Sequence, residues 1–224
     1  MAKIIAIDGP GGAGKGTISR MLAQDLGFHY LDSGALYRLL GLVAIRRKIK
    51  TDDRRNLAQL AENMDISFQT MANGQNIVLL EGEDVTDELR TEQTAALASQ
   101  VAASAEVRAA LLVRQQQFAR DPGLVADGRD MGTVVFPNAQ LKIYLTASIE
   151  ERARRRYKQL LERGENVSLR ALEEQVRLRD ERDTNREASP LALATDAVEI
   201  DTSDLSVQEV LDTVQNIVIL RGFK

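Results

Sequence analysis

A glycine-rich segment near the start of the chain restricts the fold more than any other feature. Gly9–Thr17 reads GPGGAGKGT and follows Lys3–Asp8, a continuous apolar run typical of a strand buried on both faces. Ile18–Leu26 then carries apolar residues at helical spacing, and Gly27 can end that helix. Backbone N–H groups of such a loop can surround a phosphate, while the helix start and Lys15 add positive charge. The sequence therefore predicts a phosphate-binding loop.

This phosphate loop departs at one position from the strict pattern. It consists of Gly9, Pro10, Gly11, Gly12, Ala13, Gly14, Lys15, Gly16 and Thr17. The strict pattern places a Ser or Thr, whose hydroxyl binds magnesium, directly after the lysine. Here Gly16 stands in that place and Thr17 comes next. Phosphate binding by the backbone is unaffected, whereas binding of the metal by a hydroxyl is left open. The alternative is a glycine-rich turn without a ligand.

Strands alternate with helices in most of the remaining chain, which is typical of a parallel sheet. A helix is expected from Ser33 to about Arg47, and another at Ser206–Leu220, with Val207 and Val210 on the apolar face that packs on the sheet. Buried strands are expected at Phe28–Asp32, Leu124–Asp127, Leu141–Thr146 and Ala197–Asp201. We expect an α/β fold of the phosphate-loop NTPase type, with a parallel sheet flanked by helices.

The middle of the chain follows another pattern. Ile66–Thr70 and Ile77–Glu81 flank Asn73-Gly74, a strong hairpin signal. Two helical segments rich in Ala and Leu follow between residues 91 and 120, and Ser104 is the expected N-cap of the second. We therefore expect an insertion that contains a small β-sheet.

Composition and charge exclude several classes of protein. The 224 residues include no cysteine and one histidine, His29, which argues against disulfides, thiol catalysis, zinc sites and a Ser-His-Asp triad. The net charge of −4 gives no global attraction to nucleic acid or an anionic membrane. The apolar runs have the length of strands, and Met1-Ala2-Lys3 leads into one of them without an export signal. We expect a monomeric, cytoplasmic protein that binds neither nucleic acid nor membrane.

Basic residues are nevertheless concentrated in the last third of the chain, at Glu150–Arg186. In the helix that begins near Ser148, we expect Glu150 to pair with Arg154 and Glu151 with Arg155, each four residues apart. This pairing leaves Arg152 and Arg156 as like charges four residues apart, which favours a position beside a transferring phosphate. The alternative is a solvated charged helix.

Two further motifs contain both acidic and basic residues. Asp127-Gly128-Arg129-Asp130 follows a buried strand, where Arg129 can bind a phosphate through two hydrogen bonds and Asp127 can orient magnesium-bound water. Arg179, Asp183 and Arg186 are spaced by four and three residues, so they share one helix face. The alternatives are an internal Asp–Arg turn for the first motif and a self-paired surface for the second.

Together these motifs resemble one family over essentially the whole chain. The GKGT form of the phosphate loop is similar to that of nucleoside monophosphate kinases, which transfer phosphate from ATP. The segments DSGALYR (32–38), DGRDMGT (127–133) and RDERDTNR (179–186), in this order, resemble the cytidylate kinase (CMP kinase) family of bacterial type. The resemblance implies the reaction ATP + CMP → ADP + CDP, with dCMP as a second acceptor and Mg²⁺ accompanying ATP.

The resemblance also implies roles for individual residues. It assigns Ser33, Arg38, Arg129 and Arg186 to the acceptor phosphate, Ser99, Arg108 and Asp130 to the cytosine base, and Arg179 and Asp183 to the ribose hydroxyls. Taken alone, Ser33 is equally a helix N-cap and Ser99 an ordinary helix serine. The expected catalytic groups are Lys15, Arg129, Arg152, Arg156 and Arg186, with Asp127 near the metal.

The resemblance, together with the different pattern in the middle of the chain, implies a division of the chain. A core comprises residues 1–33, 113–150 and 187–224, and an insertion at 34–112 binds the monophosphate. A helical lid at 151–170, with its tip at Gln159–Asn166, precedes a helix at 169–186. Two alternatives stay open: a kinase of small metabolites, whose acceptor lacks a base, and an ATP-switched binding protein, which needs no acceptor arginines.

Overall fold

The computed structural model describes residues 2–70 and 76–224, so the predicted turn at Asn73-Gly74 lies outside the described residues. The chain forms two compact units. The first unit comprises Met1–Asp32 and Gln115–Lys224, and the second comprises Ser33–Arg114. The predicted phosphate loop and the arginine-rich segment both belong to the first unit.

A five-stranded parallel sheet forms the centre of the first unit, in the order β2-β6-β1-β7-β8. Its strands are β1 (Lys3–Asp8), β2 (His29–Asp32), β6 (Gly123–Asp127), β7 (Leu141–Thr146) and β8 (Val198–Asp201). Strand β1 is central, and Ile5, Ala6 and Ile7 are fully buried because both of its faces are covered. The predicted strands are confirmed to within a residue. The phosphate loop leaves β1 at the carboxyl edge, where ligands bind to sheets of this kind.

Helices α1 (Lys15–Leu26) and α8 (Val207–Leu220) pack their apolar faces into the core of the sheet. The capping box formed by Ser206 and Glu209 fixes the start of α8. Val210 and Val214 are buried as predicted, but Val207 is 53% exposed. Val207 is the first residue of the helix and lies beyond the edge of the core, which the helical periodicity could not show.

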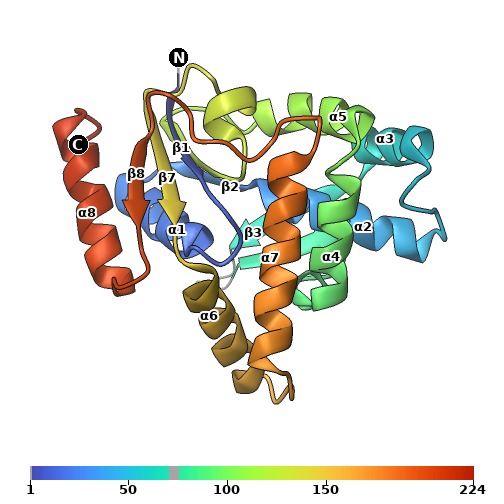
Figure 1. Ribbon diagram of the computed structural model, residues 1–224. Helices are drawn as coiled ribbons and strands as arrows, with labels where there is room; N and C mark the ends of the chain where they lie inside the picture. The colour runs from blue at the N-terminus through green and yellow to red at the C-terminus, as the bar shows by residue number, and fades with distance from the viewer. Residues whose placement is uncertain (1, 71–75) are drawn as a thin grey trace. The chain divides into compact units, whose positions relative to one another are not determined.

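Helices α6 (Ile149–Glu162) and α7 (Leu169–Asn185) lie side by side in the first unit (Figure 1). They enclose a small core of their own, made of Ala153, Leu160 and Leu172. Helix α6 continues through the predicted lid tip as far as Glu162, so the turn starts only at Arg163. Only residues 163–166 of the predicted tip therefore lie outside the helix.

The second unit contains the predicted small sheet and helices. Its elements are α2 (Ser33–Arg46), α3 (Arg54–Asn63), β3 (Ile66–Thr70), β4 (Asn76–Leu80), β5 (Glu83–Asp84), a 3₁₀ turn at Glu88–Arg90, α4 (Glu92–Val101) and α5 (Ala105–Gln116). Ser104 caps α5 as predicted, because its hydroxyl accepts a bond from the Val107 N–H. Helix α3, capped by Asp53, was not predicted. Within the described residues no single helix passes a length-and-composition test for crossing a membrane, but α4 and α5 together, bent by 102°, do.

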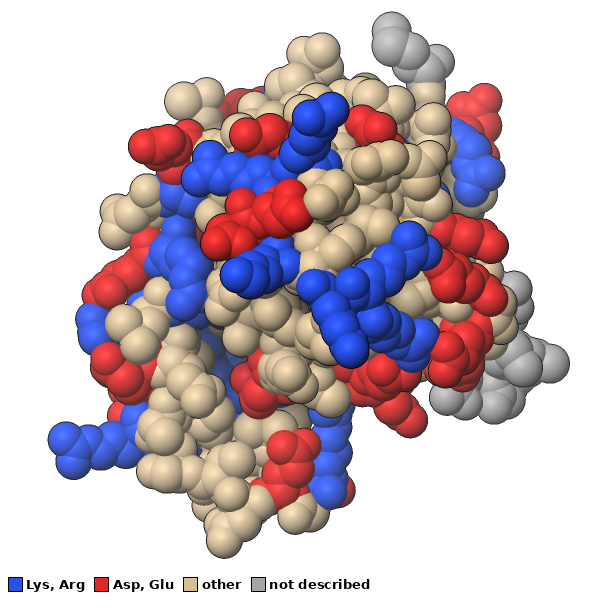
Figure 2. All heavy atoms as spheres, turned by 90° about the vertical axis from the view of Figure 1, so that its right-hand side faces the viewer, with Lys and Arg blue, Asp and Glu red and all other residues tan. Residues whose placement is uncertain are grey.

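Charged groups of both signs are interspersed on the face of the molecule drawn in Figure 2. Surface pairs such as Arg177–Glu181 and Arg46–Glu83 join neighbours of opposite charge. Such exposed pairs each contribute little to stability.

Candidate active site

The phosphate loop adopts a backbone that requires glycine at several positions. Gly9, Gly12 and Gly14 have φ angles of 140°, 84° and 89°, a region that other residues avoid. A Cβ atom at Gly9 would lie 1.9 Å from the carbonyl oxygen of Leu145, so no side chain fits there. Helix α1 begins at Lys15, directly after this curled segment, and its amino end provides an anion site.

Lys15 is held inside the loop, and its ammonium group donates to the carbonyl oxygen of Pro10 at 2.8 Å. The residue is 5% exposed. Burial lowers the pKa of Lys15 to about 7, and the nearby charges of Arg129 and Arg179 act in the same direction, against Asp127 and Asp8. The negative charge of a phosphate in the loop would favour the protonated form of Lys15.

Three arginines from distant parts of the chain converge on Gly11. A Cβ atom at Gly11 would lie 3.3 Å from Nη2 of Arg129 and 3.5 Å from Nη1 of Arg179. Arg152 donates from Nη1 to the carbonyl oxygen of Gly11 at 3.0 Å. Arg129 comes from the turn after β6, Arg152 from α6 and Arg179 from α7. The structure therefore brings together four predicted cations of the first unit: these arginines and Lys15.

Carboxylates on α7 partly neutralise these arginines. Asp183, which is 4% exposed, accepts a bond from Nε of Arg129 at 3.1 Å. Burial alone would raise the pKa of Asp183, but the charges of Arg129, Arg179 and Arg186 lower it overall. Asp180 forms two hydrogen bonds with Arg152. Asp180 was not singled out in the sequence, because its partner lies on another helix.

Asp8, at the end of β1, fixes the turn that carries Arg129 and Asp130. Its carboxylate accepts the N–H groups of Met131 at 2.8 Å and Gly132 at 2.7 Å, at the start of a short helical turn. Burial raises the pKa of Asp8 to about 6, although these two bonds act against the rise. This role of Asp8 was not predicted, since its one signal in the sequence is an acidic residue at the end of a buried strand.

A second carboxylate stands beside Gly16. Asp127 Oδ2 accepts the hydroxyl of Tyr30 at 2.9 Å, and a Cβ atom at Gly16 would lie 3.2 Å from the same oxygen. Burial, together with Asp32 opposite it on β2, raises the pKa of Asp127 to about 6. The missing side chain at Gly16 thus leaves room for a carboxylate where the strict loop pattern has a hydroxyl.

These groups fit a phosphate-bound divalent ion. Among the described residues, no three or more acidic, histidine or cysteine side chains form a group that could hold a metal alone. Mg²⁺ needs fewer protein ligands, because it keeps several waters and binds substrate phosphates with one or two carboxylates. Asp127, buried next to Gly16, is a carboxylate beside the phosphate loop.

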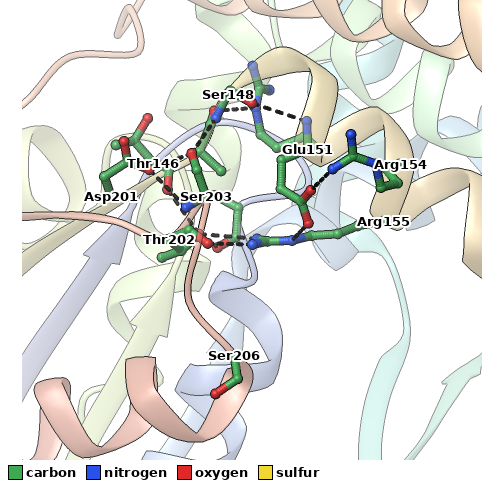
Figure 3. Close-up of polar contacts among 12 residues, drawn as sticks. Thr146, Ser148, Glu151, Arg154, Arg155, Asp201, Thr202, Ser203 and Ser206 are labelled. Carbon is green, nitrogen blue, oxygen red and sulfur yellow. Dashed lines mark hydrogen bonds and ion pairs between the residues drawn. The ribbon is translucent and has the colours of Figure 1, made fainter.

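Of the two ion pairs predicted within α6, the pair of Glu151 with Arg155 is confirmed and the pair of Glu150 with Arg154 is wrong. Arg154 and Arg155 both bind Glu151, so Arg154 does not pair with Glu150 (Figure 3). Arg155 also donates to the hydroxyl of Thr202, and that hydroxyl contacts the carbonyl oxygen of Ala13 in the phosphate loop. Arg152 has a carboxylate partner instead of being left over. Spacing along one helix does not reveal partners on other elements.

The remaining predicted residue of α6 and the one that follows α7 are only partly buried. Arg156 donates to the side-chain oxygen of Gln159 at 3.2 Å. Arg186 follows the last turn of α7 and donates from Nε to the carbonyl oxygen of Ser189 at 2.7 Å. The charge of Arg186 nevertheless acts on Asp183, as do those of Arg129 and Arg179.

Four predicted acceptor residues belong to the second unit. Ser33 and Arg38 lie on α2, Ser99 on α4 and Arg108 on α5. Ser33, Ser99 and Arg108 are buried. The guanidinium of Arg108 lies 5.4 Å from the centre of the Tyr37 ring, which stabilises a buried cation.

Several known proteins are similar to this chain over nearly its whole length. The family model described as cytidylate kinase matches residues 5–219. The chain is 53% identical over 211 residues to a cytidylate kinase of Marinomonas sp. (strain MWYL1), covering 94% of this chain and 93% of the relative. It is 54% identical over 212 residues to a cytidylate kinase of Stutzerimonas stutzeri (strain A1501), with the same coverage. A solved thymidylate kinase from Candida albicans aligns over 99% of this chain and 93% of its own, at 13% identity and a TM-score of 0.40. The chain belongs to the cytidylate kinase family.

Proposed function

We propose that this chain catalyses ATP + CMP → ADP + CDP by direct in-line transfer, and that dCMP is a second acceptor. The observation that carries the proposal is the convergence of Lys15 and three arginines on the phosphate loop. Membership of the family removes the two alternatives, the small-metabolite kinase and the ATP-switched binding protein.

The chemistry needs positive charge more than proton transfer. An oxygen of the CMP phosphate is already an anion, so no general base is required, in agreement with a chain that has one histidine. Lys15 and the loop amides hold the donor phosphates, and Arg129 orients the acceptor phosphate. Catalysis then comes from positioning and charge neutralisation.

Asp127 would hold Mg²⁺ through water, with the Tyr30 hydroxyl orienting its carboxylate. When bound, Mg²⁺ neutralises the phosphate charge that develops during transfer. The role of Asp127 is supported by its burial and by the space that Gly16 leaves next to it.

The acceptor roles of other residues are also proposals. Arg38 and Arg186 would bind the CMP phosphate, together with Ser33. Arg179 and Asp183 would bind the ribose. Ser99, Arg108 and Asp130 would read the base, because cytosine offers two acceptors and one donor. Arg156 would reach the transferring phosphate after closure of the α6–α7 hairpin, which would exclude water.

The proposed setting is a monomer in the cytoplasm that acts on small molecules alone. The net charge of −4 and the interspersed surface charges support this proposal, because neither attracts nucleic acid or an anionic membrane.

A panel of acceptors tests the proposal. With Mg-ATP, we expect kcat/KM for CMP to exceed that for AMP and GMP by about 10²-fold or more, because the buried groups of a hydrogen-bonding site reject a base that leaves them unpaired. ADP formation is measured with CMP, dCMP, UMP, AMP and GMP. A higher kcat/KM for AMP or GMP than for CMP would contradict the substrate assignment.

A substitution at Ser99 tests whether this residue recognises the cytosine base. Ser99→Ala is expected to raise KM for CMP by about fivefold, since one hydrogen bond contributes about 1 kcal/mol. A kinase whose acceptor has no base would show no change, and Ser67→Ala in the small sheet of the second unit serves as the control.

A further inference from the structure

Arg152 has most of its hydrogen-bond donors occupied by groups of the protein itself. Its Nε donates to the carbonyl oxygen of Ala147 at 2.9 Å, and its Nη1 to Gly11 and to Asp180 Oδ1, each at 3.0 Å. Its Nη2 donates to Asp180 Oδ2. These four bonds use four of the five N–H groups of a guanidinium. A phosphate could replace Asp180 only by breaking a bidentate ion pair.

The side chain of Arg152 connects three segments that are far apart in the sequence. It starts on α6, bonds to Gly11 in the phosphate loop and pairs with Asp180 on α7. It also lies against the loop, because a Cβ atom at Gly12 would be 3.0 Å from Cβ of Arg152. Movement of α7 would therefore be transmitted to the loop through this one guanidinium.

Asp180 offsets the free-energy cost of burying the charge of Arg152. Arg152 is 3% exposed, and a buried arginine without a counter-ion is strongly destabilising. The two parallel N–H···O bonds fix orientation as well as charge. The residues next to Asp180 on α7 point toward the same place: Arg179 reaches Gly11, and Asp183 one turn later binds Arg129. Asp180 thus anchors the helix that carries both groups.

We propose that Asp180 is a positioning residue for phosphoryl transfer. It holds Arg152 on the carbonyl of Gly11 and so keeps the phosphate loop and the acceptor side chains of α7 in a fixed relation. Asp180 itself does not touch a substrate. This inference rests on the proposed function, because it takes the loop as the donor site and α7 as part of the acceptor site.

Kinetics of single and double variants test the proposal. We expect Asp180→Ala to lower kcat by about 10²-fold, the cost of an error of about 1 Å in the placement of reacting groups. KM for ATP and for CMP should change less than about threefold, since only the transition state needs the alignment. Arg152→Ala should act similarly, and the double variant should be no slower than Arg152→Ala alone. Asp180→Asn, which keeps one acceptor oxygen, should lose less.

The matched control is Glu181→Gln on the same helix. Glu181 is an exposed residue that pairs with Arg177 on the surface, so its change should leave kcat unaltered. Thermal unfolding of every variant separates slow enzyme from unfolded enzyme. If Asp180→Ala does not fold, the cycle is run with Asp180→Asn and Arg152→Gln, and the double variant should again be no slower than Arg152→Gln alone.

Hydrogen exchange in the ligand-free protein provides a readout that does not depend on catalysis. Asp180→Asn should speed exchange in peptides covering residues 9–17 and 179–185, whereas Glu181→Gln should not. Three results would overturn the proposal: a kcat for Asp180→Ala within about twofold of wild type, losses that multiply in the double variant, or tighter ATP binding at unchanged kcat. Failure of the wild-type chain to phosphorylate CMP would instead refute the proposed function.

Discussion

Replacing Lys15 with methionine is expected to lower kcat/KM for ATP by about 10³-fold. Losses of this size follow when a preorganised group that stabilises a reacting oxyanion is removed. Lys15 lies inside the phosphate loop and is 5% exposed, so methionine fills its volume without supplying its charge. Because burial disfavours the ammonium group, we expect the variant to unfold at the same or a higher temperature than wild type. Steady-state kinetics and thermal unfolding measure the two effects separately.

The same lysine predicts a pH dependence of ATP binding. Its pKa in the ligand-free protein is lowered to about 7, whereas the phosphates of bound ATP favour the ammonium form and raise it. Above pH 7, ATP binding must therefore take up a proton, and ATP affinity should fall by up to about tenfold per pH unit. The sign for stability is opposite: the unfolded chain holds the extra proton between pH 7 and about 10, so the ligand-free protein gains stability as pH rises through this window.

Calorimetry of Mg-ATP binding at pH 8, in buffers of different ionisation enthalpy, measures the proton directly. We expect an uptake of nearly one proton for the wild-type chain. Lys15→Arg is the control, because a guanidinium stays charged and should take up none. Equal proton uptake in both proteins would show that another group titrates.

Replacing Arg129 with alanine is expected to affect activity and stability together. The proposed loss of its phosphate contact should lower kcat/KM for CMP by about 10²-fold or more. The change also leaves Asp183, whose side chain is 6% exposed, without the ion pair that Arg129 provides. Breaking a buried pair from one side costs about 3 kcal/mol of unfolding free energy, which urea denaturation can measure.

A second substitution separates these two effects. Arg129→Ala combined with Asp183→Asn removes the buried negative charge, so most of the lost stability should return while activity stays low. Recovery of activity along with stability would mean that Arg129 has only a structural role. Arg177→Ala is the control, because Arg177 forms an exposed ion pair with Glu174 on the surface of α7. This variant should change the unfolding free energy by less than about 0.5 kcal/mol.

Local features of the sequence were sufficient to predict the centre of the fold. The strand Lys3–Asp8, the glycine loop and helix α1 are contiguous, so apolar runs and glycine spacing identify them without tertiary information. The same holds for the N-cap at Ser104. Helix α3 was missed because its short amphipathic pattern, Leu57 and Ala61, lies among polar residues.

The partners of the site residues could not be predicted in this way. Charge spacing on α6 suggested that Arg152 lacks a partner, but Asp180, 28 positions later, provides one. Asp8 bonds to backbone N–H groups more than 120 residues away, and no side-chain pattern marks a backbone donor. Motifs selected the candidate residues, whereas the parallel sheet and the α6–α7 pair determine which of them meet.

Transfer of a labelled phosphoryl group tests the central claim most directly. The enzyme is incubated with ATP labelled in its γ-phosphate, Mg²⁺ and CMP, and the products are separated. We expect the label in the β-phosphate of CDP, one ADP for each CDP, and little inorganic phosphate when CMP is left out. Label released as inorganic phosphate at the same rate with and without CMP, or retained on the protein as a phosphoenzyme, would contradict direct transfer between two bound nucleotides.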